Sequence, residues 1–227
     1  DLVETLHHGL ADNSVGRVVE GLLRHDLVII SDEIYEKVLY DGTQHISIAT
    51  LSPEVAARTV VINGVSKAYA MTGWRIGYAA GPKPLLTAMA NIQSQSTSNP
   101  CSISQKAAVA ALRLGNPFTK TMVTEFDRRR RVMVDRLNKM PGVTCCMPTG
   151  AFYAFPNVSG LLGKRWKDQP IGSAANLATY LLNEAQVAVV PGEPFGSDIH
   201  IRLSYATAME AIERGLTRID AALRRLS

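Results

Sequence analysis

The sequence has 227 residues, of which 46% are hydrophobic and 19% charged, and no apolar run reaches the ~20 residues of a membrane-spanning helix. This length and composition fit a soluble globular protein of one domain, or one and a half, and exclude a transmembrane protein. The net charge of +4 comes from scattered basic residues, which suit anionic small molecules better than nucleic acid.

The cysteines and the first residues indicate where the protein works. Cys101, Cys145 and Cys146 form an odd set with two adjacent members, which is a poor disulfide framework and points to a reducing compartment. The opening residues 1–4 are acidic and lack the apolar segment of a signal peptide. We therefore expect a cytoplasmic protein.

The first half of the chain reads as alternating helices and strands. Helical spacing of apolar residues predicts a helix over 15–25, and short apolar runs predict strands that suit a parallel sheet covered on both faces. The predicted strands are 27–30, 59–63 and 76–80, and the helices that follow are 83–93, 102–114 and 117–140.

Beyond residue 140 the pattern changes to short strands around two helices. The expected strands are 143–146, 152–155, 187–190 and 199–204, and the expected helices are 173–184 and 208–226. The change indicates two domains, 1–120 and 121–227, which divide within the long helix. That helix carries four consecutive arginines, Arg128 to Arg131, which spread around its axis and predict a solvated helix rather than a nucleic-acid patch.

Polar and reactive side chains follow the predicted strands. Asp32 and Tyr35 come directly after the first strand, and Ser66, Lys67 and Arg75 follow the second. In open α/β sheets, sites form beyond the carboxyl ends of the strands. Each residue alone has a plain alternative, because an Asp after a strand is often a helix cap and a Lys after a turn is often solvated.

Three segments together resemble one enzyme family. The segment 64–77, Gly-Val-Ser-Lys-Ala-Tyr-Ala-Met-Thr-Gly-Trp-Arg-Ile-Gly, looks like the pyridoxal-phosphate attachment motif of class I aminotransferases of fold type I. Residues 32–35, Asp-Glu-Ile-Tyr, resemble the motif that contacts the pyridine ring, and residues 201–206, Ile-Arg-Leu-Ser-Tyr-Ala, resemble the substrate-carboxylate motif. Within the family the sequence is most similar to the bacterial type of aspartate aminotransferase.

The resemblance implies a role for each cofactor-contacting residue. Lys67 would form an aldimine with pyridoxal 5'-phosphate and then shuttle the substrate proton as the catalytic base. Asp32 would face the pyridine nitrogen and keep the ring an electron sink, and Tyr35 would donate to the phenolate oxygen. Ser66 and Arg75 would hold the phosphate.

Arg202 would take the substrate α-carboxylate in a bidentate pair, where the plain alternative is a surface arginine on a strand. The resemblance implies no metal ion.

The resemblance also implies that the chain is truncated at its N-terminus. Residues 1–120 would be part of the large, cofactor-binding domain, with a partial, mostly parallel sheet and helices on both faces. Residues 121–227 would be the smaller α+β C-terminal domain. The Asn-Pro-x-Gly motif expected before the first strand is absent from residues 4–14. We therefore expect the isolated chain to bind cofactor poorly.

The expected function is transfer of an amino group between an amino acid, with aspartate favoured, and a 2-oxo acid, as part of biosynthetic amino-acid metabolism. The alternatives are an inactive remnant, a cofactor-binding domain without activity, or another fold type I enzyme of the same cofactor. The family usually forms homodimers, so a homodimer is expected, with neither nucleic acid nor membrane as a partner.

Overall fold

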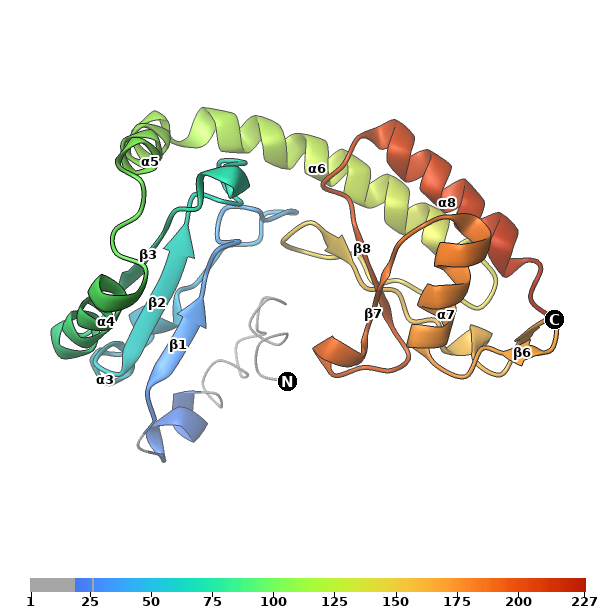
Figure 1. The fold of residues 1–227 in the computed structure, drawn as a ribbon, viewed down its shortest axis with the longest axis horizontal. Coiled ribbons are helices and arrows are strands. Elements are labelled where there is room, and N and C mark those ends of the chain that lie inside the picture. The colour runs from blue at the N-terminus through green and yellow to red at the C-terminus, as the bar shows by residue number, and fades with distance from the viewer. Residues whose placement is uncertain (1–18, 26) are drawn as a thin grey trace. The chain divides into compact units, whose positions relative to one another are not determined.

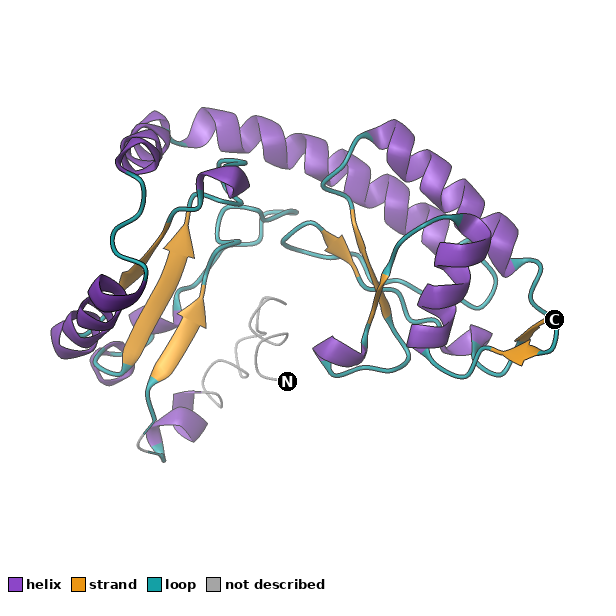
Figure 2. Cartoon of the chain, in the orientation of Figure 1, coloured by secondary structure: helices purple, strands orange, loops and turns teal. Residues whose placement is uncertain are grey.

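The computed structural model describes residues 19–25 and 27–227 (Figures 1 and 2). The chain divides into two compact units between Val123 and Thr124, and each is described by itself. The first unit holds the described residues up to Val123, and the second holds Thr124–Ser227. Within the described residues, no helix combines the length and the apolar character that a membrane crossing needs.

A three-stranded sheet forms the centre of the first unit. Its strands are β1 (Ile29–Asp32), β2 (Thr59–Gly64) and β3 (Gly77–Ala80), with β2 in the middle (Figure 1). The run of β-branched residues in β2 explains its central place, because these side chains pack well on a pleated sheet. β1 begins two residues later than expected, since the amide of Ile29 donates to the carbonyl of Arg58 and sets the register there.

The sheet is mixed among the described strands, with one antiparallel strand at its edge. β1 runs parallel to β2, whereas β3 runs antiparallel to it, with Gly64 opposite Gly77. The connection between β2 and β3 is too short for a crossover helix and carries only the 3-10 turn Thr72–Trp74. It therefore returns the chain from the same edge at which β2 ends, which requires antiparallel pairing.

Three α-helices accompany this sheet among the described elements. α5 (Ser102–Leu114) matches its prediction, and α4 (Lys83–Ser96) runs three residues past it. α3 (Pro53–Ala56) was not predicted, although Ser52 caps it by accepting a hydrogen bond from the amide of Val55. The helix expected over 15–25 is described only at its end, where residues 19–23 are helical, and residues 15–18 lie outside the described residues.

The second unit packs helices against a small antiparallel sheet. The long helix α6 (Asn116–Leu137) leads into it, and its sheet has the order β4-β8-β7. The other described elements are β4 (Tyr153–Ala154), β5 (Arg165–Trp166), β6 (Gln169–Pro170), α7 (Ala174–Tyr180), β7 (Val190–Pro191), β8 (Ile201–Ser204) and α8 (Met209–Leu223).

The core of this unit follows from the amphipathic pattern of α8. Its buried residues recur at helical spacing, at Met209, Ile212, Leu216, Ile219 and Leu223. The hydroxyl of Tyr180 on α7 donates to the carbonyl of Ala222 at 2.8 Å, which fixes α7 to α8.

Some segments of the second unit depart from their predictions. Residues 143–146 form no strand, only a single bridge between Thr144 and Asn157. The Asn138 side chain instead bonds both the amide and the carbonyl of Cys145, at 2.7 and 2.9 Å, and so occupies the groups that a strand partner would need. The helix expected over 173–184 changes after Tyr180 into a π-helical turn, Leu181–Ala185.

The sequence predicts that the arginine run is solvated, but the structure exposes only some of its members. Arg130 is fully buried, where its guanidinium donates to the Asp127 carboxylate and to the carbonyl of Pro148. Arg128 and Arg131 are exposed and pair with Glu125 and Asp127. Helical spacing indicates the side of the helix on which each arginine lies. It does not show that the segment around Pro148 covers Arg130.

Candidate functional site

The carboxyl ends of β1 and β2 form the edge at which most of the predicted site residues lie. Because the two strands are parallel, Asp32 pairs in register with Ile62, and the ladder continues where the amide of Glu33 donates to the carbonyl of Ile62 at 2.9 Å. Asp32 is exposed, and its Oδ1 accepts from the amide of Ile34 at 3.1 Å. This local contact is a turn-type bond that holds the carboxylate at the strand end.

Lys67 lies in the turn that follows β2, at the same edge. Its neighbours Val65 and Ala68 are buried and anchor the turn, and Thr119 on α6 donates its hydroxyl to the carbonyl of Ala68 at 3.0 Å. The half-buried Lys67 places its Nζ 5.7 Å from the centre of the Tyr35 ring. The structure thus brings together an amine and a phenol from two separate strand ends.

Ser66 and Arg75 bound the loop between β2 and β3. The carbonyl of Ser66 accepts from the amide of Met71 at 3.1 Å, which folds the loop back on itself. Arg75 is exposed, with the left-handed φ of 53°, and its guanidinium donates to the carbonyl of Thr72 at 2.9 Å. Because β3 starts at Gly77 opposite Gly64, Arg75 also returns to the edge where β2 ends.

Arg202 belongs to the second unit, on β8, where it pairs with Val190 of β7. Its guanidinium lies close to two aromatic rings, with its central carbon 4.6 Å from the ring centre of Tyr153 and 4.4 Å from that of Phe195. Such stacking restrains the planar guanidinium and is worth a fraction of a kcal/mol to about 2 kcal/mol per ring. Arg202 is half-buried, so it is not the plain surface arginine of the alternative interpretation.

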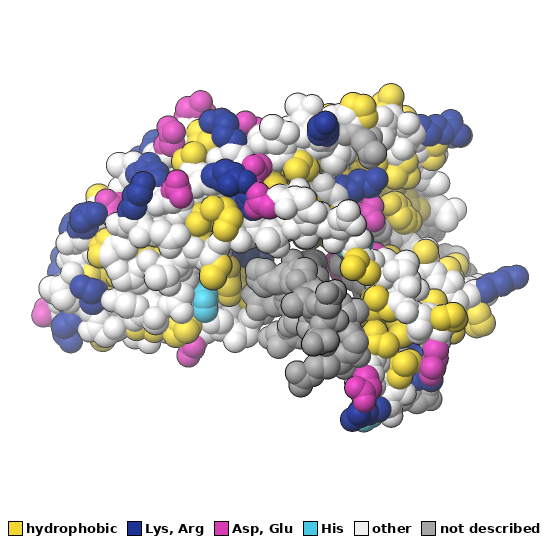
Figure 3. All heavy atoms as spheres, turned by 180° about the vertical axis from the view of Figure 1, so that it is seen from behind, with side chains coloured by type: hydrophobic (Ala, Val, Ile, Leu, Met, Phe, Trp, Pro, Cys, Tyr) yellow, Lys and Arg dark blue, Asp and Glu magenta, His cyan; other side chains and the backbone are white. Residues whose placement is uncertain are grey.

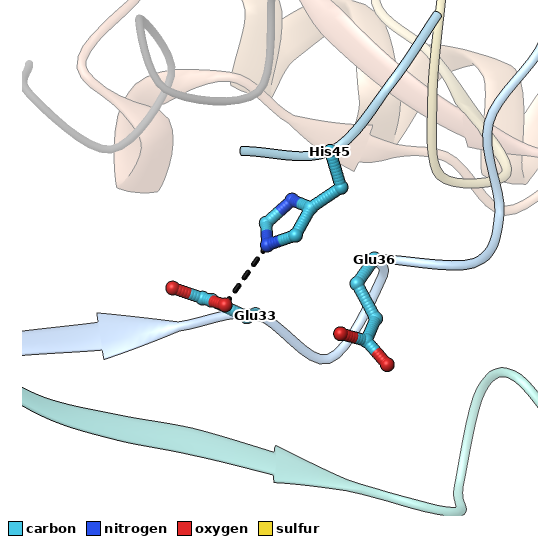
Figure 4. A group of neighbouring side chains, drawn as sticks. All are labelled: Glu33, Glu36 and His45. Carbon is cyan, nitrogen blue, oxygen red and sulfur yellow. Dashed lines mark hydrogen bonds and ion pairs between the residues drawn. The ribbon is translucent and has the colours of Figure 1, made fainter. Parts of the chain in front are cut away.

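Sequence reasoning missed Glu33 and His45, which lie beside this edge. Glu33 is only 5% exposed, and its carboxylate accepts from His45 Nε2 at 2.8 Å (Figure 4). Side-chain oxygens of Glu33, Glu36 and a ring nitrogen of His45 lie within 4.8 Å of one another. Glu33 stands inside the motif that drew attention to Asp32, but no local pattern links it to His45 twelve residues later.

Tyr78 on β3 is 43% exposed, yet part of its ring is shielded from water. Desolvation raises the pKa of Tyr78 above its usual value, and the nearby charge of Glu36 raises it further. Tyr78 lies opposite Asn63 in the ladder, on the strand next to the one that leads to Lys67.

Comparison with known proteins gives matches over nearly the whole chain. A sequence model of the family "Aminotransferase class I and II" matches residues 13–219. An aspartate aminotransferase of Geobacillus stearothermophilus is 49% identical over 88% of this chain and 50% of its own length. That of Rhizobium meliloti strain 1021 is 48% identical over 92% of this chain and 52% of its own length.

Solved structures agree with the sequence matches. The crystal structure of the aspartate aminotransferase from Rhizobium meliloti superposes with a TM-score of 0.88 at 45% identity, covering 96% of this chain and 56% of that one. An aromatic aminotransferase from Pyrococcus horikoshii gives a TM-score of 0.82 at 36% identity, covering 95% and 56%. The chain therefore spans about half the length of the curated relatives it matches.

Proposed function

The chain belongs to the class I and II aminotransferase family. We propose that it forms part of a pyridoxal 5'-phosphate-dependent aminotransferase. The enzyme would transfer an amino group between an amino acid, with aspartate favoured, and a 2-oxo acid. Support for aspartate comes from relatives of 45–49% identity that carry the name aspartate aminotransferase. The observation that carries the proposal is the Lys67 amine 5.7 Å from the Tyr35 ring, at the edge where β1 and β2 end.

The donor set at this edge fits the cofactor. It offers an amine for the aldehyde, a carboxylate for the ring nitrogen, a phenol for the ring oxygen, and a hydroxyl and a guanidinium for the phosphate; these belong to Lys67, Asp32, Tyr35, Ser66 and Arg75. When bound, the cofactor supplies an electron sink for the bonds of the substrate Cα.

The residues of the chain supply binding and proton transfer. Lys67 would hold the cofactor through its amine, and as a free amine its Nζ would take up and return the proton of the substrate Cα. The Asp32 carboxylate keeps a proton on the ring nitrogen, because an adjacent negative charge favours the protonated form. Arg75 is always charged and would turn from its bond with the Thr72 carbonyl to the phosphate oxygens.

Arg202 would bind the α-carboxylate of the substrate. A guanidinium matches a carboxylate with two parallel hydrogen bonds, and the nearby rings of Tyr153 and Phe195 restrain its position. The first unit would then correspond to part of the large cofactor-binding domain, residues 1–120, and the second to the small domain, residues 121–227. The observed division at Val123 and Thr124 supports this assignment.

The setting of the enzyme is part of the same proposal. We infer a cytoplasmic homodimer in biosynthetic amino-acid metabolism. The free cysteines Cys101, Cys145 and Cys146 support a reducing compartment, and the names of the relatives support amino-acid metabolism. Size-exclusion chromatography with light scattering tests the homodimer, since a monomer at all concentrations would contradict it.

Titration of the chain with pyridoxal phosphate tests the attachment directly. Binding to an amine shifts the absorbance of the cofactor, and we expect this shift to be lost in Lys67→Ala. The matched control is Lys83→Ala, which removes an exposed lysine at the start of α4 in the same unit. Equal shifts in Lys67→Ala and the unmodified chain would overturn the proposal.

A further inference from the structure

We propose that Glu33 is a positioning residue for this site, a role that rests on the proposed function. Its buried carboxylate would hold the turn bearing Asp32 and Tyr35 in the orientation that faces the cofactor. The Glu33 carboxylate bonds side chains outside the proposed cofactor contacts, and it acts through Asp32 and Tyr35.

Both oxygens of the Glu33 carboxylate are engaged by side chains from two segments. One oxygen accepts from the hydroxyl of Ser31 at 3.1 Å and from that of Ser47 at 2.7 Å. The other oxygen accepts from the Nε2 of His45 at 2.8 Å (Figure 4). Ser31 lies on β1, whereas His45 and Ser47 come from a loop, so the carboxylate ties the strand end to that loop.

The backbone of Glu33 is fixed as firmly as its side chain. Its amide donates to the carbonyl of Ile62 on β2, and its carbonyl accepts from the amide of Glu36 at 3.0 Å. The residue is therefore held on one side by the sheet and on the other by the 45–47 loop. Asp32 precedes it directly and Tyr35 follows two residues later, so neither can move freely while these contacts persist.

A buried carboxylate is costly unless its hydrogen bonds are satisfied, and here three donors satisfy it. A metal site formed by Glu33, Glu36 and His45 is a weaker interpretation of the same group. A cation there would compete with the hydroxyls of Ser31 and Ser47 and with the Nε2 of His45 for the two Glu33 oxygens. The contacts that are present describe a structural clamp rather than a set of open ligands.

Small displacements of positioned groups reduce binding and catalysis strongly, because a site must be held within a fraction of an ångström. Loss of the clamp would let the turn relax. The Asp32 carboxylate and the Tyr35 hydroxyl would then meet the ring nitrogen and ring oxygen less often.

The test compares Glu33→Ala and Glu33→Gln with a control in the same sheet. Glu33→Gln keeps the shape and one accepting oxygen, and it should retain part of the clamp. The control is Thr59→Val at the opposite end of β2, where the buried Thr59 hydroxyl donates to the carbonyl of Val55 at 2.7 Å. The control removes a buried hydrogen bond far along the strand from the site edge.

Two measurements are made on each variant. In the cofactor-free chain, amide hydrogen exchange over residues 33–38 should become about tenfold faster in Glu33→Ala and less so in Glu33→Gln. With pyridoxal phosphate, the pH dependence of the cofactor absorbance should shift in Glu33→Ala, because Asp32 and Tyr35 tune the ring. Thr59→Val should change neither measurement. If Glu33→Ala does not fold, Ser47→Ala replaces it, with a smaller effect of the same direction.

The outcomes separate the two proposals. If the unmodified chain does not attach the cofactor through Lys67 even at saturating pyridoxal phosphate, the proposed function fails and this inference fails with it. If attachment occurs but the exchange rates and the pH dependence of Glu33→Ala match those of the unmodified chain, the inference alone is overturned. Faster exchange with an unchanged cofactor spectrum would also overturn it, since Glu33 would then be only a structural residue.

Discussion

The two compact units differ in how completely they bury their apolar side chains. Among the described residues, all of the exposed large hydrophobic side chains except Met147, Leu182 and Val190 lie in the first unit, and such side chains are visible at the molecular surface (Figure 3). The helices show the same contrast, because α4 has no buried residue whereas α8 buries six. The unit that carries Lys67 is thus the one with the thinner core.

The unit expected to be more stable is therefore not the unit that carries Lys67. Residues 124–227 bury more of their large apolar side chains than the first unit does. Their free energy of unfolding should therefore be higher, since local stability follows buried apolar contact. The edge formed by the carboxyl ends of β1 and β2 is held instead by local contacts. These are the anchored turn at Lys67, the hydrogen bond from Thr119 to the Ala68 carbonyl, and the contacts of the Glu33 carboxylate. Small changes there should affect the site before they affect the whole chain.

The largest expected effect on stability is at the buried arginine of the second unit. Asp127→Ala removes the carboxylate that pairs with the fully buried Arg130, and it should lower the free energy of unfolding by about 3–5 kcal/mol. Urea denaturation, monitored by amide hydrogen exchange in α8, measures the loss of stability.

The matched control is a surface pair of the first unit. Glu54→Ala breaks the pair between Glu54 and Arg58, whose oxygen and nitrogen are 3.2 Å apart, and it should cost no more than about 1 kcal/mol. Equal losses in the two variants would remove the contrast between a buried and an exposed ion pair.

A second pair of substitutions compares the two cores directly. Leu216→Ala on α8, at a residue that is 1% exposed, should destabilise the second unit by about 2–5 kcal/mol. Ile92→Gln on α4, at a residue that is 72% exposed, should change stability by less than about 0.5 kcal/mol. Denaturation curves for both variants check this, and a large loss in Ile92→Gln would show that the apolar side chains of α4 are covered in solution.

The smallest expected effect concerns the cysteines. Backbone amides at the start of α5 lower the pKa of the exposed Cys101, whereas burial raises the pKa of Cys145 from 9.0 to about 11. Near pH 8, iodoacetamide should therefore modify Cys101 much faster than Cys145. Peptide mapping of the labelled chain measures the two rates, and faster labelling of Cys145 would contradict its burial.

The same pKa gives a direction for stability. Because the folded state raises the pKa of Cys145, its stabilising contribution is complete below pH 9 and is lost as the pH rises toward about 11. Replacement by Ala should flatten this part of the pH profile of unfolding, after correction for the lost side chain.

Much of the fold could be predicted because its elements have strong local signals. The β-branched run of β2 and the regular spacing in α5 and α8 fix those elements without tertiary help. The two-residue strands β5 and β6 have no such signal, and the strand expected at 143–146 was lost to side-chain bonds from Asn138.

For the candidate site, the sequence places Asp32 and Lys67 just after two predicted strands, and the parallel pairing of β1 and β2 brings those two strand ends to one edge. The burial of Glu33 and Arg130 could not be predicted, because each depends on a segment distant in the chain: the 45–47 loop for Glu33 and Pro148 for Arg130. Local spacing gives the direction of a side chain but not what covers it.

The most direct test of the central claim is to locate the lysine that holds the cofactor. The chain is incubated with pyridoxal phosphate, reduced with borohydride to make the attachment permanent, and digested for peptide mapping. We expect the cofactor mass on the peptide that contains Lys67, and its disappearance in Lys67→Ala but not in Lys83→Ala. Reproducible attachment at another lysine, with Lys67 unmodified, would contradict it.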